Sequence, residues 1–274
     1  MKNSSPELLA WGHYSPSSLC KFLKLLTAVG LARGKSTHSI YQLWLKFHGT
    51  TVDTSVRGIR YRLNITDNIT DKKILCSSRM YDQAELHFLK EACHKGAFVD
   101  AGANIGYYSL FLAKNGAKAV LSIEPNPRTI ERLRFNIATN DLGNKIQIES
   151  SGIGELGESF FNSNIDLGCA SIVDEQEKGD FIKIKTKPLL QIVQEHGLQE
   201  ISGMKIDIEG HEDRALIPFL QHAPKELWPK RIVLEHAHEK QWQLNLNKVL
   251  AESGYTILHK TRANTLLSLL FKHT

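Results

Sequence analysis

The chain has 274 residues, of which 42% are hydrophobic and 23% charged, as in an ordinary globular domain. Its formal net charge at pH 7 is +5, and the charged residues are spread along the chain, so this pattern predicts no nucleic-acid partner. Four widely spaced cysteines without a CxxC pair speak against a zinc site or a disulfide framework, and they favour a reducing, cytoplasmic location.

Residues 1–50 predict a helical N-terminal extension. Apolar residues recur at helical spacing over 19–29, and a second short helix is expected over 39–47. The apolar stretch 22–31 contains a lysine and is too short to span a bilayer, which takes about 20 apolar residues. Flanking basic residues leave weak peripheral membrane contact open, although packing of this helix on the core is the preferred interpretation.

The pattern changes at residue 51, where the main domain is expected to begin and to run to residue 274. Apolar residues mostly two apart over 56–65 predict a strand, and residues 73–76 are the expected partner strand across a polar turn at 67–71. A helix is predicted over 81–94.

From residue 97 onward, short apolar strands alternate with helices. Strands are predicted at 97–100, 119–124, 146–148, 181–185, 204–208, 231–235, 255–259 and 265–270, and helices at 105–114, 127–140, 188–196, 212–221 and 241–253. This alternation predicts an α/β fold with a mostly parallel, doubly wound sheet. In such sheets ligands bind at the carboxyl ends of the strands.

A glycine loop follows the strand that ends at Asp100. Its glycines, Gly102 and Gly106, do not fit the GxGxxG dinucleotide fingerprint, and no Gly-Lys-Ser/Thr of a P-loop follows. The loop carries no Lys or Arg to neutralise a pyrophosphate. Glu124 ends the next strand, where a carboxylate can accept hydrogen bonds from ribose hydroxyls. A nucleoside without phosphates, such as S-adenosylmethionine, therefore fits best, and a nicotinamide dehydrogenase is disfavoured.

Further cofactor contacts are expected around this loop. Asp100 and the loop backbone can meet the amino-acid end of the ligand, and Asn104 can either do the same or adopt a left-handed conformation for backbone reasons alone. Ser151 follows the third strand, where the adenine edge is expected to pass. The plainer interpretation is that Asp100, Gly102 and Gly106 only make a strand-to-helix turn.

Three blocks of the sequence resemble the signature of the FkbM-type methyltransferases. They read VDAGANIGYYS at 99–109, IEPNP at 123–127 and KIDIEGHE at 205–212, and the resemblance runs from about residue 80 to 255. It implies a class I methyltransferase (Rossmann-like) fold with strand order 3-2-1-4-5-7-6, strand 7 antiparallel, and S-adenosylmethionine as cofactor. It also implies O-methylation, often of sugar hydroxyls in glycans or glycosylated natural products. Family members usually carry Thr-Leu-Asp where this chain has Thr-Lys-Pro at 186–188.

Asp207 and Glu209 are the first candidates for chemistry. Methyl transfer is a displacement at a sulfonium, which needs the acceptor oxygen in line and its proton removed. Either carboxylate lies at the end of a predicted strand and can act as that base or orient acceptor hydroxyls. Alternatively, Glu209 and Glu212 cap the following helix, whose N-terminus favours negative charge.

Histidines near the same strand ends are further candidates for the base. His236 is the one we select, and His211 and His238 stay open. No ligand spacing demands a metal ion, so none is predicted. The expected acceptor is a small molecule or a glycan, selected by residues 1–80 and 162–180. The alternative function is a catalytically silent binding or scaffold protein that keeps the cofactor.

Overall fold

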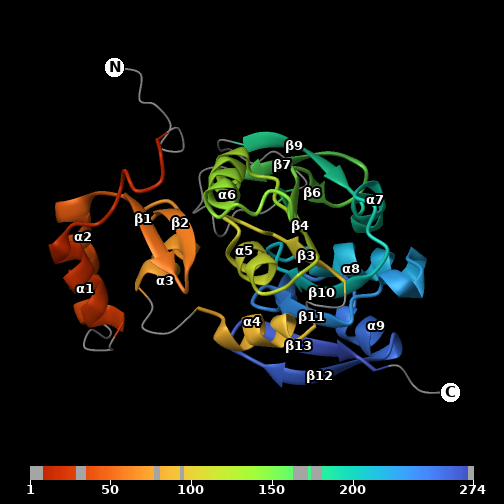
Figure 1. Cartoon of the computed structure of the whole chain (residues 1–274). Helices are drawn as coiled ribbons and strands as arrows, with labels where there is room; N and C mark the ends of the chain where they lie inside the picture. Colours follow the sequence, from red (N-terminus) through yellow and green to blue (C-terminus); the bar gives the residue numbers. More distant parts are fainter. Residues whose placement is uncertain are drawn as a thin grey trace.

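The computed structural model describes residues 9–28, 35–76, 81–92, 96–162, 172–173 and 181–270. A central sheet with helices on both faces lies beside a smaller N-terminal unit of helices and a hairpin (Figure 1). None of the helices in these ranges is long and apolar enough to cross a bilayer.

The central sheet has seven strands in the order β12-β13-β11-β10-β3-β4-β5. Their bounds are β3 Ala97–Ala101, β4 Ala119–Ile123, β5 Ile146–Glu149, β10 Ile201–Ile206, β11 Arg231–Glu235, β12 Tyr255–Lys260 and β13 Asn264–Leu269. Neighbours are parallel from β5 to β11, whereas β13 runs antiparallel to both β11 and β12. Numbered within this sheet, the order is 3-2-1-4-5-7-6, which confirms the class I methyltransferase fold.

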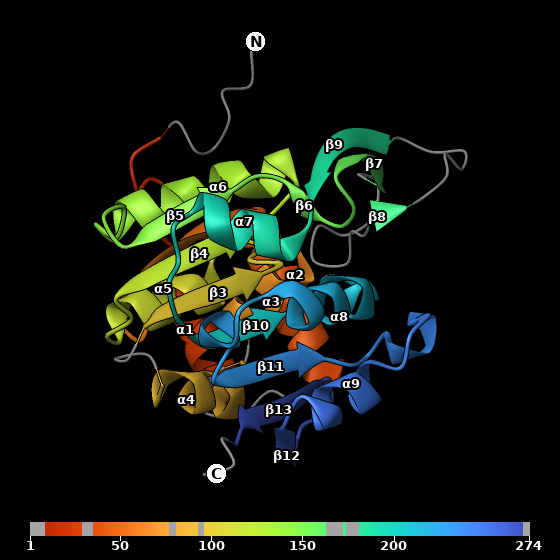
Figure 2. The ribbon, with the colours of Figure 1, turned by 90° about the vertical axis from the view of Figure 1, so that its right-hand side faces the viewer.

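Helices cover both faces of this sheet (Figures 1 and 2). On one face lie α4 Gln83–Lys90, α5 Tyr107–Lys114 and α6 Pro127–Thr139, and on the other α7 Leu189–Glu195, α8 Glu212–His222 and α9 Leu246–Glu252. Two short 3-10 turns lie at Lys225–Leu227 and Glu239–Gln241. Because side chains alternate along a strand, Phe98 is buried in the core on the first face and Val99 in the core on the second.

A second sheet of four strands lies beside the main one, in the order β6-β9-β7-β8. The strands are β6 Gly152–Ile153, β7 Gly157–Asn162, β8 Ile172–Val173 and β9 Phe181–Lys187. The strand predicted at 181–185 thus pairs outside the central sheet. Most of the segment 162–180, which we expect to select the acceptor, lies outside the described residues.

The N-terminal unit contains α1 Ser18–Ala28, α2 Lys35–His48, β1 Thr51–Val56, β2 Ile59–Asn64 and α3 Ile69–Cys76. The two expected helices are present, but the expected partner strand at 73–76 is wrong. Those residues end α3, and β2 pairs with β1 instead. The hairpin turns on Arg57 and Gly58, both with positive φ (51° and 75°), as in a two-residue primed turn. Arginine gives no sequence signal for that turn, so β1 was missed.

Candidate functional site

The predicted site residues converge at one edge of the central sheet. Gly102, Glu124 and Asp207 directly follow strands β3, β4 and β10, and Glu235 ends β11. These four strands are parallel neighbours, so their carboxyl ends share one edge. The order of the strands therefore gathers residues that lie up to 133 positions apart in the sequence, counted from Gly102 to Glu235.

Both loop glycines are required by packing. A Cβ on Gly102, where φ is +79°, would lie 1.9 Å from the carbonyl oxygen of Asp207. A Cβ on Gly106, where φ is +92°, would lie 2.6 Å from Leu133 Cδ1. The glycines let the loop fit between the end of β10 and helix α6, whatever ligand it holds.

Glu124 is buried and fixed by the backbone around it. Its Oε2 accepts a hydrogen bond from the Asn104 N–H and its Oε1 one from the Asn126 N–H, both at 2.9 Å. Asn104 adopts a left-handed conformation with φ of 50°. Burial raises the pKa of Glu124 to about 7. Each carboxylate oxygen keeps a second lone pair that can accept a ribose hydroxyl.

Two other predicted cofactor residues present buried polar atoms. Asp100 Oδ2 accepts hydrogen bonds from the N–H and the hydroxyl of Ser109. Asp100 Oδ1 and Ser151 Oγ are buried and have no hydrogen-bond partner among the described residues. Burial raises the pKa of Asp100. Buried polar atoms are normally paired, so these two fit a site that receives the polar groups of a nucleoside.

Lys205 is a residue of the site that the sequence interpretation missed. Its ammonium donates to the Gly102 carbonyl at 3.1 Å and pairs with Asp207 at 3.0 Å. Burial by itself lowers a lysine pKa, but Asp207 and Asp100 outweigh it and hold the pKa of Lys205 above its ordinary value. A lysine within the buried strand 201–206, two residues before an aspartate, is the signal that could have found it.

The carboxylates beyond β10 and β11 form the acidic side of the site. Glu209 Oε2 lies 3.0 Å from His238 Nε2, and the Glu209 backbone has a left-handed φ of 57°. Burial, and then the nearby charges of Asp207 and Glu235, raise the pKa of Glu209 to about 8. The same kinds of cause raise the pKa of Glu235 to about 7. These groups therefore hold protons more tightly than exposed carboxylates.

Glu212 binds the turn before helix α8, whereas the capping alternative expected it to bind the N-terminal N–H groups of that helix. Its Oε1 accepts hydrogen bonds from the backbone N–H groups of Ile208 and Gly210, at 2.9 and 3.2 Å. Its Oε2 accepts one from the Trp242 indole at 2.8 Å. Glu212 thus fixes the turn after β10, whereas the Glu209 carboxylate pairs with His238.

The candidate histidines lie in different surroundings. His236 Nδ1 lies 3.0 Å from the hydroxyl of Thr265 on β13, and His211 occupies the N-cap position of α8. His238 pairs with Glu209, one of the two candidate carboxylates. Within the described ranges, no three His, Cys, Asp or Glu side chains are grouped so that they could hold a metal ion.

Comparison with known families gives a match to the Methyltransferase FkbM domain over residues 100–259, which is more than half of the chain. The chain belongs to the FkbM methyltransferase family. It is an S-adenosylmethionine-dependent methyltransferase. That the glycine loop, Glu124, Asp100 and Ser151 hold the cofactor stays a prediction.

Individual relatives of this FkbM-domain protein differ in their annotated roles. It is 25% identical over 194 residues to the methyltransferase sdnD of Sordaria araneosa, covering 58% of this chain and 73% of that protein. It is 31% identical over 145 residues to a tRNA wybutosine-synthesizing protein 2 homolog of Mus musculus, covering 50% of this chain and only 29% of that protein. A solved structure of M. capricolum TrmK with S-adenosyl-homocysteine aligns with a TM-score of 0.41 and 11% identity, over 69% of this chain and 68% of that chain.

The mouse relative corrects one prediction, that nucleic acid is excluded as a partner. That exclusion rested on charges being spread evenly along the sequence. Spacing along a chain does not determine where charges gather on the folded surface, so the inference had no structural basis.

Proposed function

We propose that this FkbM-domain protein methylates a hydroxyl oxygen, with a sugar of a glycan or of a glycosylated natural product as the acceptor. The observation that carries the proposal is the group of carboxylates Asp207, Glu209 and Glu235 beside the cofactor loop. Carboxylates accept hydrogen bonds from hydroxyl groups and fix their direction. Their negative charge favours a neutral or cationic reacting group over an anionic one.

In this proposal Glu209 takes the proton of the acceptor hydroxyl. When bound, S-adenosylmethionine supplies a methyl group on a positively charged sulfur. A carboxylate with a pKa of about 8 is a stronger base than an exposed one, and it lies closer to the ideal for proton transfer near neutral pH. His238 holds the Glu209 carboxylate in place. Asp207, fixed by Lys205, orients the acceptor.

The second candidate acceptor is a nucleoside of RNA. The likeness to the tRNA wybutosine-synthesizing protein favours it, although the chain spans less than a third of that relative. The two acceptor classes predict different labelled products, so one experiment separates them.

The experiment measures transfer of tritium-labelled methyl from S-adenosylmethionine to a panel of neutral oligosaccharides and to unmodified tRNA. The proposal expects label in oligosaccharide, and expects Glu209→Gln to lower turnover at least about a hundredfold, in the range of general-base removal. Glu239→Gln is the matched control, because Glu239 is exposed on the nearby 3-10 turn. Label in tRNA alone supports the second candidate. Cofactor binding without any transfer supports the silent binding protein.

A further inference from the structure

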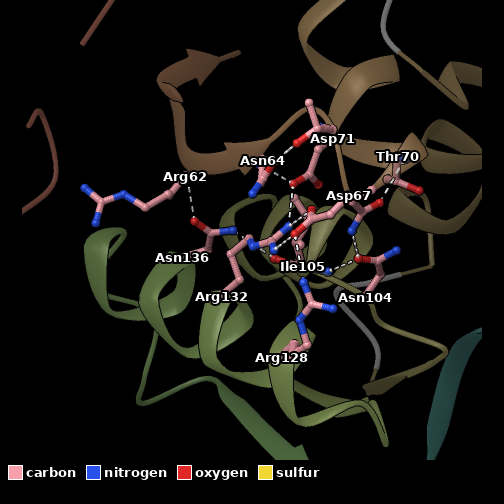
Figure 3. A network of polar contacts seen from close by, with 12 residues as sticks. Arg62, Asn64, Asp67, Thr70, Asp71, Asn104, Ile105, Arg128, Arg132 and Asn136 are labelled. Carbon is pink, nitrogen blue, oxygen red and sulfur yellow. Dashed lines mark hydrogen bonds and ion pairs between the residues drawn. The ribbon is translucent and has the colours of Figure 1, made fainter. Parts of the chain in front are cut away.

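The N-terminal unit is joined to helix α6 by a buried polar interface (Figure 3). Arg132 of α6 contacts Asp71 at 2.9 Å and Asp67 at 3.0 Å. The side chains of Arg132 and Asp71 are 6% and 0% exposed, so this contact is desolvated. The interface therefore fixes the turn after β2 and the first turn of α3 against the domain that holds the cofactor loop.

One side chain of this interface reaches the backbone of the cofactor loop. Asn136 of α6 is fully buried, and its Oδ1 accepts a hydrogen bond from the Arg62 N–H of β2 at 2.7 Å. Its Nδ2 donates to the carbonyl oxygen of Ile105 at 3.1 Å (Figure 3). The hairpin and the loop are thus connected through a single amide.

Asn68 makes a second contact with the loop, at Asn104. Its Nδ2 donates to Asn104 Oδ1 at 2.7 Å, while its Oδ1 accepts from the Thr70 N–H at the start of α3. Asn68 is 1% exposed, so water cannot replace these bonds. Both ends of the amide are engaged, which fixes its orientation.

Asn104 is the residue whose backbone N–H donates to Glu124. It does so from a left-handed conformation, which is strained for a residue with a side chain. Its Oδ1 receives both Asn68 Nδ2 and the Ile105 N–H, and these two bonds hold the strained conformation.

We propose that Asn68 is a positioning residue for the methyl donor: by holding Asn104, it keeps the cofactor loop in its binding conformation before the cofactor arrives. Residues 51–76 are then part of the cofactor site. Asn68 lies in the polar segment 67–71 that the sequence analysis treated as a plain turn. The proposal rests on the cofactor of the family and not on the identity of the acceptor.

The test measures binding of S-adenosylhomocysteine by isothermal titration, together with thermal unfolding. Asn68→Asp is the sharpest variant, because it keeps an oxygen for the Thr70 N–H and loses the donor to Asn104. We expect Asn68→Asp and Asn68→Ala to raise Kd on the order of tenfold, the usual effect of one lost hydrogen bond. Combined with Asn104→Ala, either variant adds little further loss, because both changes break the same contact.

Asn140→Ala is the matched control. Asn140 joins the end of α6 to β2, as Asn136 does, since its Nδ2 donates to the Arg60 carbonyl and its Oδ1 accepts from the Arg60 N–H; the hydrogen bonds of its side chain go to Arg60 and Asn136 and not to the loop. We expect this variant to lower Tm and leave Kd unchanged. The proposal is overturned if Asn68→Asp binds like the wild type, or if Asn140→Ala weakens binding equally. Failure of the sugar assignment would leave this binding result untouched, because no acceptor is present.

Discussion

Glu209 Oε2 lies 3.0 Å from His238 Nε2, beyond the carboxyl ends of β10 and β11. The two residues come from the loops after β10 and β11, so the pair forms only when those strands lie side by side. The side chain of Glu209 is 17% exposed and that of His238 38%, so the pair opens toward solvent at the histidine. The carboxylate is therefore the more shielded member of the pair, in agreement with the burial that raises its pKa.

The first prediction concerns the pH dependence of turnover. Because burial raises the pKa of Glu209 to about 8, most of the base is protonated and inactive below that pH. At saturating cofactor and acceptor, kcat should fall about tenfold per pH unit below roughly pH 7.5 and level off above pH 8.5. This fall of kcat at low pH should be absent in Glu209→Gln and present in Glu239→Gln. A flat profile in the wild type would remove Glu209 from the role of base.

The second prediction concerns Glu124 and cofactor affinity. Ribose hydroxyls donate to a carboxylate more strongly than to a protonated carboxyl, and the pKa of Glu124 in the free protein is about 7. Affinity for S-adenosylhomocysteine should therefore rise between pH 6 and pH 8 and change little above it. Glu124→Gln should weaken binding about 10- to 100-fold, as for a lost hydrogen bond to a charged group. Glu131→Gln, at an exposed position on α6, is the control. Equal affinities of the two variants would exclude Glu124 from the site.

The central fold could be predicted because local and long-range signals agree there. Strands β3, β4, β10 and β11 are short apolar runs, as expected for parallel strands buried on both faces. Their order, however, came from the family resemblance, since apolar runs do not say which strand neighbours which. The hairpin was missed because Thr51–Val56 is largely polar. Asp53 is buried there in an ion pair with Arg62, and it also accepts hydrogen bonds from the Gly12 and Tyr14 N–H groups.

Those candidate site residues that lie at the carboxyl ends of strands could be predicted from the sequence. Asp100, Glu124 and Asp207 occupy such positions, which follow from the chain itself. Lys205 and Asn68 were missed because their roles depend on partners brought close by folding: the Gly102 carbonyl lies 103 residues from Lys205, and Asn104 lies 36 residues from Asn68. Two residues so far apart in the sequence form no local pattern from which their contact could be predicted.

The third prediction concerns Gly102. An alanine Cβ at this position would lie 1.9 Å from the Asp207 carbonyl oxygen, on a backbone whose φ of +79° is strained for any side chain. Gly102→Ala should therefore lower the unfolding free energy by several kcal/mol, about 3 or more, and cofactor binding should be lost as a consequence. Gly143→Ala is the control, because its Cβ would meet nothing within 4 Å. An unchanged Tm in Gly102→Ala would contradict the packing role.

The last prediction concerns Lys205, which neutralises the buried side of the acidic site. Lys205→Met keeps the length of the side chain but removes the charge that faces Asp207 and Asp100 and the donor to the Gly102 carbonyl. The Asp207 side chain is 31% exposed, so the expected cost is about 1.5–3 kcal/mol, as for a lost hydrogen bond to a charged group. Urea unfolding should show a loss of that order at pH 8, and the loss should shrink as the pH falls, because burial raises the pKa of Asp100 and its protonation relieves part of the unpaired charge. Lys183→Met is the control, since its pair with Glu158 is more than half exposed and contributes little.

Adding Asp207→Asn to Lys205→Met should restore part of the lost stability, because it removes the charge left without its partner. Additive losses in that double variant would show that the two residues do not act as a pair.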